Sequence, residues 1–540
     1  MRQSKILLLL ISGVALLAFG IGLLAFGETT VVFAQAGESD YIGVRECSSC
    51  HRTMVREHGE TAHGLALQDV ERDKDPILAD FDEGEDVRTV TFPGEDTPRA
   101  FTDDDIVYVI GSGKRVQRYL YEVERREYMV LPAEWNVETG EWEPLSLAEN
   151  WPDPAYDWAQ NCAYCHVTNF DVERGRWDDD GVQCEACHGP GSEHAELAGD
   201  ARGEPTDEEL AAVRAAINPG VDPQICGQCH SRGTNADGLP YPAGYVPGAE
   251  LSEFITLFSP DDAAHWYPTG HASGANMQYN EWSNTGHATS LSNLLANADD
   301  VDSSCLTCHS GDYGFTERLI TAVRDGERTG AAPESLTPDT AHYGVSCTTC
   351  HNPHSEAGLP ANLVQESYPL CTSCHSTENY TGEGVHHPVK EMFEGIQVLP
   401  QVSSRPSDHF LNMEGPTCQT CHVPVVPVET YFTRSSHAFE PVLPAETVDV
   451  AGLVDSCSGC HEEAVSPELI QKLIDDVQTD AHTRIDAARA AVNAGTPSWV
   501  IEALDFVEGD GSFGIHNYAY ADALLDAVFT ELDLFPATGE

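Results

Sequence analysis

Residues 181–190 read GVQCEACHGP, and the pentapeptide Cys-x-x-Cys-His at the centre of this stretch occurs nine times along the chain. The nine copies account for all 18 cysteines. Chance predicts only about 0.03 copies in a chain of this length and composition. The motif cysteines are Cys47, Cys50, Cys162, Cys165, Cys184, Cys187, Cys226, Cys229, Cys305, Cys308, Cys347, Cys350, Cys371, Cys374, Cys418, Cys421, Cys457 and Cys460. The motif histidines are His51, His166, His188, His230, His309, His351, His375, His422 and His461.

This spacing is typical of covalent haem attachment. Each thiol adds to one vinyl group of the porphyrin, and the adjacent histidine lies under the iron as its proximal ligand. Zinc ribbons pair Cys-x-x-Cys units but need no histidine after each pair. A redox dithiol occurs once in a βαβ unit, and a disulfide framework belongs to small exported domains. The sequence therefore predicts nine c-type haems.

The surface is strongly acidic. The chain has 28 Lys and Arg against 88 Asp and Glu, a formal net charge of −60. Binding to a nucleic-acid backbone needs clustered basic residues, so this class of protein is excluded. The charge favours basic or neutral partners, and we expect other cytochromes or a quinol-oxidising complex. The acidic runs at residues 103–105 and 178–180 suggest calcium only weakly, because they lack the spacing of a known calcium loop.

The N-terminal segment predicts export. Residues 6–26 are apolar and uncharged, and Ala34-Gln35-Ala36 follows them. The small-x-small site is typical of signal-peptidase cleavage, whereas the apolar run is also long enough to span a bilayer. A cleaved signal peptide and an uncleaved membrane anchor are thus alternatives for residues 1–36. Either one places the protein outside the cytoplasmic membrane, as a periplasmic, cell-surface or secreted protein.

The rest of the chain is expected to be mainly α-helical, with much irregular structure organised around the haems. Residues 37–300 contain four motifs and residues 301–465 contain five, which predicts two haem modules. Strand patterns at residues 87–92, 106–110, 116–124 and 127–131, with turns at 111–113 and 125–126, predict a small β-meander within residues 87–143. Residues 466–540 contain no motif, and their apolar periodicity after Ser466-Pro467 predicts a helical hairpin.

The chain has 23 histidines, so those outside the motifs are numerous enough to give every iron a second histidine ligand. Some follow a motif closely, and others share a repeated element, found as Thr61-Ala62-His63, Thr285-Gly286-His287 and Ser435-Ser436-His437. In the first two copies, Glu57 and Glu281 lie six residues before the histidine. A glycine three residues before the motif also recurs, at Gly181, Gly344 and Gly415. A histidine close to its own motif usually reaches a neighbouring haem. The predicted sixth ligands are His63, His194, His287, His354, His387, His409, His437, His516 and, at the edge of an apolar helix face, His482.

On these motifs the sequence resembles known multihaem cytochromes c. Residues 41–63 and 181–194 are similar to tetrahaem cytochromes that accept electrons from hydroxylamine oxidoreductase. Residues 347–375 resemble the doubled Cys-x-x-Cys-His domain, and residues 514–517 resemble the start of the C-terminal helices of the hydroxylamine oxidoreductase–nitrite reductase superfamily. The chain departs from the enzymes of that superfamily because it has no Cys-x-x-Cys-Lys motif and no identifiable cross-linking tyrosine.

Two functions from different classes follow. The first is an electron carrier in which nine mostly bis-histidine haems connect a membrane or periplasmic donor with an extracytoplasmic acceptor. The second is an oxidoreductase that acts on a small nitrogen or sulfur oxyanion at one open-coordinate haem, with nitrite, hydroxylamine or tetrathionate as substrate. Arg115, Arg118 and Tyr119 would then be candidate donors, although a solvated strand face is the simpler explanation of these residues. A homo-oligomer or filament is compatible with either function.

Overall fold

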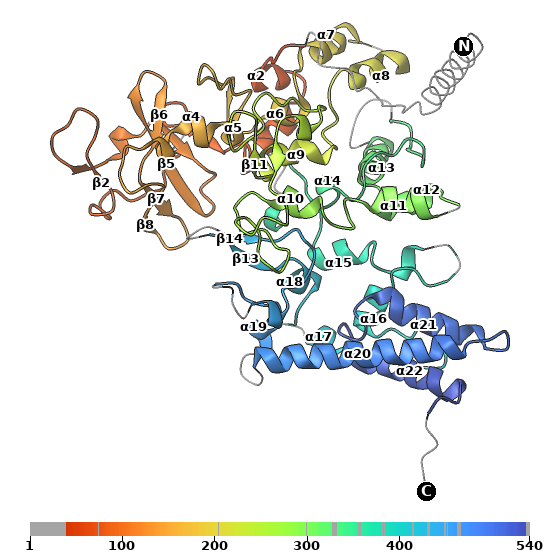
Figure 1. The fold of residues 1–540 in the computed structure, drawn as a ribbon. Helices are drawn as coiled ribbons and strands as arrows, with labels where there is room; N and C mark the ends of the chain where they lie inside the picture. Colours follow the sequence, from red (N-terminus) through yellow and green to blue (C-terminus); the bar gives the residue numbers. More distant parts are fainter. Residues whose placement is uncertain are drawn as a thin grey trace, which may run out of the picture. The chain divides into compact units, whose positions relative to one another are not determined.

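The computed structural model describes residues 39–535 except 74, 204, 299, 327–331, 355–357, 381, 383, 413–414, 429–431, 448–449, 451 and 462–465. The predicted signal peptide or anchor at residues 1–36 lies outside the described residues. Within the described part, no helix is both long enough and apolar enough to cross a membrane. The described residues belong to one unit, Ser39–Glu540. As predicted, this unit is mostly helical and irregular, with a few small sheets (Figure 1).

The largest sheet has six strands and lies in the N-terminal part of the unit. Its order is β1 (Leu67–Asp69), β4 (Tyr108–Ile110), β5 (Val116–Glu124), β7 (Ala133–Asn136) and β8 (Glu141–Pro144), with β6 (Glu127–Val130) also paired to β5. Successive side chains of a strand point to opposite faces. Tyr119 and Leu120 of β5 are both fully buried, because an apolar cluster covers each face of the sheet.

The predicted meander is therefore part of a larger sheet. Strand β5 and the β5–β6 turn at Arg126, with φ +66°, lie where the sequence predicts them. Strands β1, β7 and β8 were not predicted. Thr89–Val90 (β2) pairs instead with Arg99–Ala100 (β3), in a separate two-stranded sheet.

Each haem motif lies on a short helix or begins or ends at one. The Cys-x-x-Cys-His spacing places residues i, i+3 and i+4 on one side of a helical turn, so both thiols and the imidazole point the same way. Asp222 and Asp302 cap two of these helices by accepting hydrogen bonds from the backbone N–H groups of Gln224 and Ser304. The motif helices are α2 (Val44–Cys47), α5 (Ala163–His166), α6 (Cys184–His188), α9 (Pro223–His230), α12 (Ser303–His309), α14 (Cys347–Cys350), α15 (Ser367–Thr372), α18 (Cys418–His422) and α19 (Ser458–His461).

Three helices, rather than the expected hairpin, form the C-terminal region: α20 (Pro467–Ala491), α21 (Ser498–Asp510) and α22 (Tyr518–Glu531) (Figure 1). Ser466 caps α20 by accepting a hydrogen bond from Leu469 N–H. Helix α21 was missed because it buries residues on most of its sides, including Val500, Leu504 and Phe506, and so has no clear apolar stripe.

Shorter elements complete the described structure. The remaining α-helices are α3 (Arg52–His58), α4 (Trp158–Asn161), α7 (Ser192–Asp200), α8 (Asp207–Ala215), α10 (Gln278–Trp282), α11 (Ser290–Asn297), α13 (Gly311–Arg324), α16 (Val389–Glu394) and α17 (Asp408–Leu411). Further two-stranded sheets pair β9 (Val167–Thr168) with β10 (Asp179–Asp180), β11 (Gly233–Thr234) with β12 (Thr256–Leu257), and β13 (Val425–Val428) with β14 (Phe432–Ser435).

Candidate haem sites

A cavity of about 4650 Å³ runs between the motif helices. Pockets for one small ligand measure roughly 300–1,000 Å³, so this cavity has room for several large cofactors. Both cysteines of seven motifs line it, together with Cys165 and Cys308 of the other two. Eight of the nine proximal histidines also line it, the exception being His166. The thiols and imidazoles thus face a space that fits a series of covalently bound haems.

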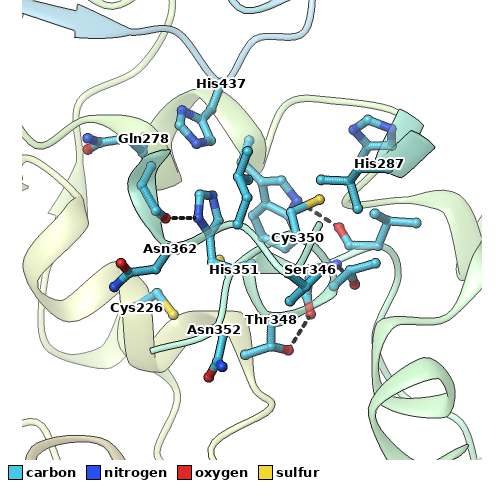
Figure 2. A pocket seen from close by; sticks show the side chains of 18 of the residues that line it. Cys226, Gln278, His287, Ser346, Thr348, Cys350, His351, Asn352, Asn362 and His437 are labelled. Carbon is cyan, nitrogen blue, oxygen red and sulfur yellow. Dashed lines mark hydrogen bonds between the residues drawn. The ribbon is translucent and has the colours of Figure 1, made fainter. Parts of the chain in front are cut away.

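Eight proximal histidines each face a second histidine ring. Two imidazoles bound to opposite faces of one metal ion, each through a bond of about 2 Å, would have ring centres about 6 Å apart. Figure 2 shows one such pair, His351 and His437, in the cavity. The distances between ring centres are 6.2 Å for His51–His194, 5.9 Å for His188–His354, 6.1 Å for His230–His63, 6.0 Å for His309–His387, 6.1 Å for His351–His437, 6.0 Å for His375–His287, 6.0 Å for His422–His516 and 6.3 Å for His461–His409.

Backbone carbonyls fix the orientation of several proximal rings. His188 Nδ1 lies 2.7 Å from the carbonyl oxygen of Asn218, and His351 Nδ1 lies 2.7 Å from that of Ala361. An N–H at Nδ1 that donates to a carbonyl leaves the lone pair on Nε2, the atom available to a metal. These contacts therefore hold the imidazoles in the tautomer that iron ligation requires.

Burial lowers the pKa of several of these imidazoles. Burial and neighbouring histidines lower the pKa values of His63 and His375 to about 4. Burial, with His351 nearby, lowers the pKa of His437 to about 4 as well. For His516, burial also lowers the pKa, but a hydrogen bond to Asp510, with Nδ1 2.7 Å from Oδ1, raises it above its usual value.

The repeated glycine three residues before a motif supports a histidine-bearing loop. A Cβ on Gly344 would lie 2.6 Å from the carbonyl oxygen of His287, and one on Gly415 would lie 2.4 Å from that of His409. In the third copy, the N–H of Val182, next to Gly181, donates to the carbonyl oxygen of His63 at 2.9 Å. The absence of a side chain at the glycine lets the loop rest directly on the motif.

The angles between the ring planes of the eight pairs range from 9° to 76°. The three pairs whose histidine loop rests on a motif glycine are nearly perpendicular, with interplanar angles of 75° for His63–His230, 72° for His287–His375 and 76° for His409–His461. Three other pairs are closer to parallel, with 22° for His51–His194, 9° for His188–His354 and 28° for His351–His437. The remaining two pairs, His309–His387 at 44° and His422–His516 at 57°, lie between these values. The loops that rest on a motif glycine thus share one ligand geometry.

His166 is the exception among the proximal histidines. The described residues include all 23 histidines, and none of their rings pairs with His166. Its ring centre lies 5.9 Å from that of Trp158, and its Nδ1 lies 3.1 Å from the carbonyl oxygen of Ala66. Burial lowers the pKa of His166, and the nearby guanidinium of Arg118 lowers it further.

The β-segment donors have structural partners. The Nε of Arg118 lies 2.7 Å from Oε2 of Glu134, and Tyr119 is fully buried in the sheet. Arg115 donates to the carbonyl oxygen of Thr433 at 3.5 Å. Of the three residues, Arg118 is the one that also lies near a motif histidine.

The other predicted sixth ligand, His482, is exposed, and its ring centre lies 3.8 Å from that of Phe513. The structure places no second histidine ring beside it within the described residues, and its role as a ligand stays a prediction.

His58 bridges two haem segments, because its ring nitrogens lie 2.8 Å from the carbonyl oxygen of Val182 and 3.1 Å from that of Pro353.

A buried ion pair supports His437 and was only partly visible in the sequence. Glu281, which the repeat places six residues before His287, is fully buried, and Arg434 is 6% exposed. Their Oε2 and Nη1 atoms lie 2.6 Å apart, and Glu281 Oε2 also accepts from His437 N–H at 2.6 Å. Burial raises the pKa of Glu281, but Arg434 holds it below its usual value. The equivalent Glu57 is exposed, so the repeat alone did not reveal this role.

The acidic runs do not assemble a cation site in the described part of the chain. Asp105 forms an ion pair with Arg99, and Asp179 accepts a hydrogen bond from Val44 N–H. Among the described residues, the metal-ligand cluster that the structure presents consists of His309, His386 and His387.

Contacts between cysteines show which motifs are neighbours, with motifs numbered in chain order. Each motif would hold its porphyrin through two thiols, so motifs whose cysteines are in contact would hold neighbouring porphyrins. The contacts join motifs 1 and 3 through Cys47–Cys184, 2 and 4 through Cys165–Cys229, 4 and 6 through Cys226–Cys347, 5 and 7 through Cys308–Cys374, and 7 and 8 through Cys371–Cys418. Cys226, Cys374 and Cys460 also lie near enough to raise the pKa values of Cys187, Cys350 and Cys421, respectively, in addition to the effect of burial.

Comparisons with known proteins agree with this arrangement. Residues 140–189 match the family described as cytochrome c554 and c-prime, and residues 341–380 match the doubled CXXCH motif. No curated protein sequence matches the chain.

Two solved structures cover almost the whole chain. The outer cell wall cytochrome OcwA is 30% identical, covers 91% of this chain and 99% of its own, and superposes with a TM-score of 0.71. The undecahaem cytochrome from the S-layer of Carboxydothermus ferrireducens is 21% identical, covers 93% of this chain and 70% of its own, and has a TM-score of 0.56. This second likeness concerns the fold alone.

Proposed function

The chain belongs to the family of multihaem c-type cytochromes that includes the outer cell wall cytochrome OcwA, and we propose that it is an extracytoplasmic nine-haem electron carrier. Haem supplies one-electron redox chemistry, and the protein sets the distance, orientation and surroundings of each group. The observation that carries the proposal is that eight proximal histidines face a second histidine ring at 5.9–6.3 Å. Such pairs close the coordination of iron and leave no position for a substrate.

The axial ligands in this proposal combine each motif histidine with its facing ring. The second ligands are His194, His354, His63, His387, His437, His287, His516 and His409 for motifs 1, 3, 4, 5, 6, 7, 8 and 9. The carbonyl contacts at Nδ1 and the lowered pKa values of His63, His375 and His437 support this assignment, because both leave Nε2 unprotonated.

The cysteine contacts support a route with two side branches. The order 1–3–4–6–7–8–9 forms the main line, motif 2 lies beside motif 4, and motif 5 lies beside motif 7. Motifs 1 and 9 are then the ends at which a donor and an acceptor would dock. Cys50 of motif 1 and Cys460 of motif 9 are the two cysteines classed as exposed, which is consistent with electron entry and exit there.

The proposed location is the cell surface or the space next to it. The two similar structures are named for the outer cell wall and the S-layer. The expected partners are other redox proteins of neutral or basic charge, and either N-terminal alternative, cleaved signal or anchor, is compatible with this location.

The test combines haem counting with low-temperature electron paramagnetic resonance of the oxidised holoprotein. The expected result is nine haems, with low-spin ferric signal from about eight of them. A film of the protein on an electrode should exchange electrons reversibly without added substrate. High-spin signal from several haems would contradict the axial pairs and with them the carrier.

A second function is favoured by the one motif whose proximal histidine has no facing histidine. Motif 2 would then act on a small nitrogen or sulfur oxyanion, with the positive charge of Arg118 nearby to favour an anion. Its position as a side branch off motif 4 is that of a terminal site and not of a relay. The acidic surface of the chain opposes an anionic substrate.

The test of this second function uses nitrite, hydroxylamine and tetrathionate. Turnover with one of them, together with loss of a one-haem high-spin signal when it is added, would establish the activity. Arg118→Gln should raise KM for that substrate, while Arg115→Gln, at the neighbouring exposed position, serves as control. If none of the three compounds alters the signal, motif 2 is a carrier like the others.

A further inference from the structure

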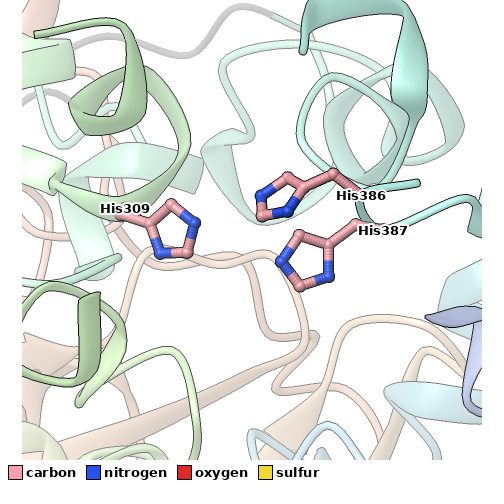
Figure 3. A group of neighbouring side chains, drawn as sticks. All are labelled: His309, His386 and His387. Atoms are coloured by element: carbon pink, nitrogen blue, oxygen red, sulfur yellow. The ribbon is translucent and has the colours of Figure 1, made fainter. Parts of the chain in front are cut away.

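Motif 5 differs from the others in having two consecutive histidines opposite its proximal ring. The ring centres of His386 and His387 lie 6.1 and 6.0 Å from that of His309. One ligand atom from each of the three rings lies within 4.8 Å of the other two. Figure 3 shows the three rings gathered around a common space.

Both distances fall within the range of the other axial pairs. The His386 and His387 rings are 4.3 Å apart between centres and inclined by 63°, so they lie side by side and not one behind the other. An iron with four porphyrin nitrogens and His309 has one remaining position. The two imidazoles therefore compete for the same place.

The backbone of His387 has an unfavourable conformation. Its φ is +47°, in the left-handed region that bulky L-residues rarely adopt, and Pro388 follows it. A residue before proline is normally driven to extended conformations, so the position is unfavourable for two reasons. His387 lines the central cavity, whereas His386 does not. The His386 ring rests against Tyr380 at 4.4 Å and 23°.

The proximal ring of this motif also has a different environment. His309 Nδ1 is buried and has no hydrogen-bond partner within the described residues. At motifs 3 and 6, a carbonyl at 2.7 Å fixes the corresponding ring. Without such a contact, the orientation of His309 is less restricted, and it can match either of two opposing rings.

We propose that His386 and His387 are interchangeable sixth ligands of the iron at motif 5. The proposal rests on the axial pairing proposed above. In the exchange, the bond from iron to one imidazole nitrogen breaks and the bond to the other forms, with no net transfer of an electron or proton. The His387 ring also lies 6.1 Å from that of His375, so the exchange takes place where the side branch meets motif 7.

The experiment compares the holoprotein with His386→Asn, His387→Asn and the double variant by electron paramagnetic resonance of the oxidised state. Asparagine is used because it tolerates the left-handed backbone of residue 387. Each single variant should keep the wild-type high-spin signal, since the other histidine takes over. The double variant should gain high-spin signal equal to one haem, and free imidazole should remove that gain. Haem content is measured for every variant to establish loading.

The matched control is His409→Asn, which removes the single ring facing His461 and should itself add one high-spin haem. A gain in either single variant would show that only one of the two histidines is competent, and would overturn the proposal. No gain in the double variant would overturn it as well, because neither histidine would then be a ligand. If the control also shows no gain, the axial pairing in general is wrong, and the failure lies in the proposed function.

Discussion

Glu281 and Arg434 form a buried ion pair whose contact with a ligand histidine could not be predicted from their positions in the sequence. The pair is almost inaccessible, and Arg434 also donates to the carbonyl oxygen of Ala272 at 2.8 Å. Removing one partner of a buried ion pair leaves an uncompensated charge, which costs more than the pair itself contributes. Because Glu281 also binds the backbone of His437, the ion pair connects global stability with the position of one ligand.

Arg434→Met should therefore destabilise the holoprotein by about 3–5 kcal/mol. Lys472→Met is the control, because Lys472 pairs with Asp476 at the surface and its side chain is 64% exposed. Exposed pairs contribute about 0–1 kcal/mol, so this control should change the free energy of unfolding very little. Denaturant unfolding followed by absorbance measures both variants, and equal effects would contradict the role assigned to the buried pair.

Gly344→Ala tests the support of a ligand loop by the motif beneath it. The added Cβ would meet the carbonyl oxygen of His287 at 2.6 Å, and overpacking of this kind costs about 1–3 kcal/mol. We expect a lower unfolding temperature and a changed low-spin signal from one haem. Gly286→Ala, in the same loop, has no atom within 4 Å of the new Cβ and should leave both measurements unchanged.

Among the elements, the C-terminal helices differ from the haem modules because they have a core of their own. Helices α20, α21 and α22 pack around Leu504, Phe506 and Leu524, and Met392 joins them from α16. With nine motifs in a chain of this length, the sequence suggests that the haems supply much of the buried apolar surface. In this core and in the two clusters of the sheet, apolar side chains bury one another.

Leu504→Ala should destabilise the C-terminal region by about 2–5 kcal/mol, because Leu504 is fully buried and the change leaves a cavity. Leu473→Ala, at a position that is 52% exposed, should cost no more than about 0.5 kcal/mol. Thermal unfolding followed by far-ultraviolet circular dichroism distinguishes the two. A similar loss in both variants would show that the helices are held by the haem modules instead.

The local sequence pattern predicted the elements that are long and that have a clear periodicity or helix cap. Strand β5 has nine residues of strand pattern, and α20 has a serine cap, proline at its first position and a periodic apolar face. Strands β7 and β8 are short, and α21 is apolar on most sides, so neither pattern stands out. The histidine pairs could be predicted only as a set of candidates, since partners such as His188 and His354 are far apart in sequence and meet through tertiary packing alone. For the same reason the isolation of His166 was invisible in the sequence.

For the whole molecule, the net charge of −60 governs how partners approach. Association with a positively charged redox partner should be accelerated by electrostatic steering, by about 10- to 1,000-fold at low salt. Raising the ionic strength from 0.01 to 0.15 M shortens the Debye length from about 30 to 8 Å and should remove most of this acceleration.

A stopped-flow measurement of electron transfer from the reduced holoprotein to a basic cytochrome tests this prediction. The second-order rate constant should fall with salt, whereas transfer to a neutral dye should change little. A rate constant for the basic cytochrome that does not depend on salt would mean that the docking site lies away from the acidic surface.

The proposed pairing of distant histidines would also fix an order of events during synthesis. In motifs 4, 7 and 9 the facing histidine precedes the motif, so it has already been made when the motif emerges from the ribosome. In motif 3 the facing histidine follows the motif, because His354 comes much later in the chain than His188. The carbonyl of Pro353, which contacts His58, is made immediately before His354. The N-terminal half therefore cannot complete its haem sites until the second half has been translated, and a chain that ends at residue 300 would lack both contacts.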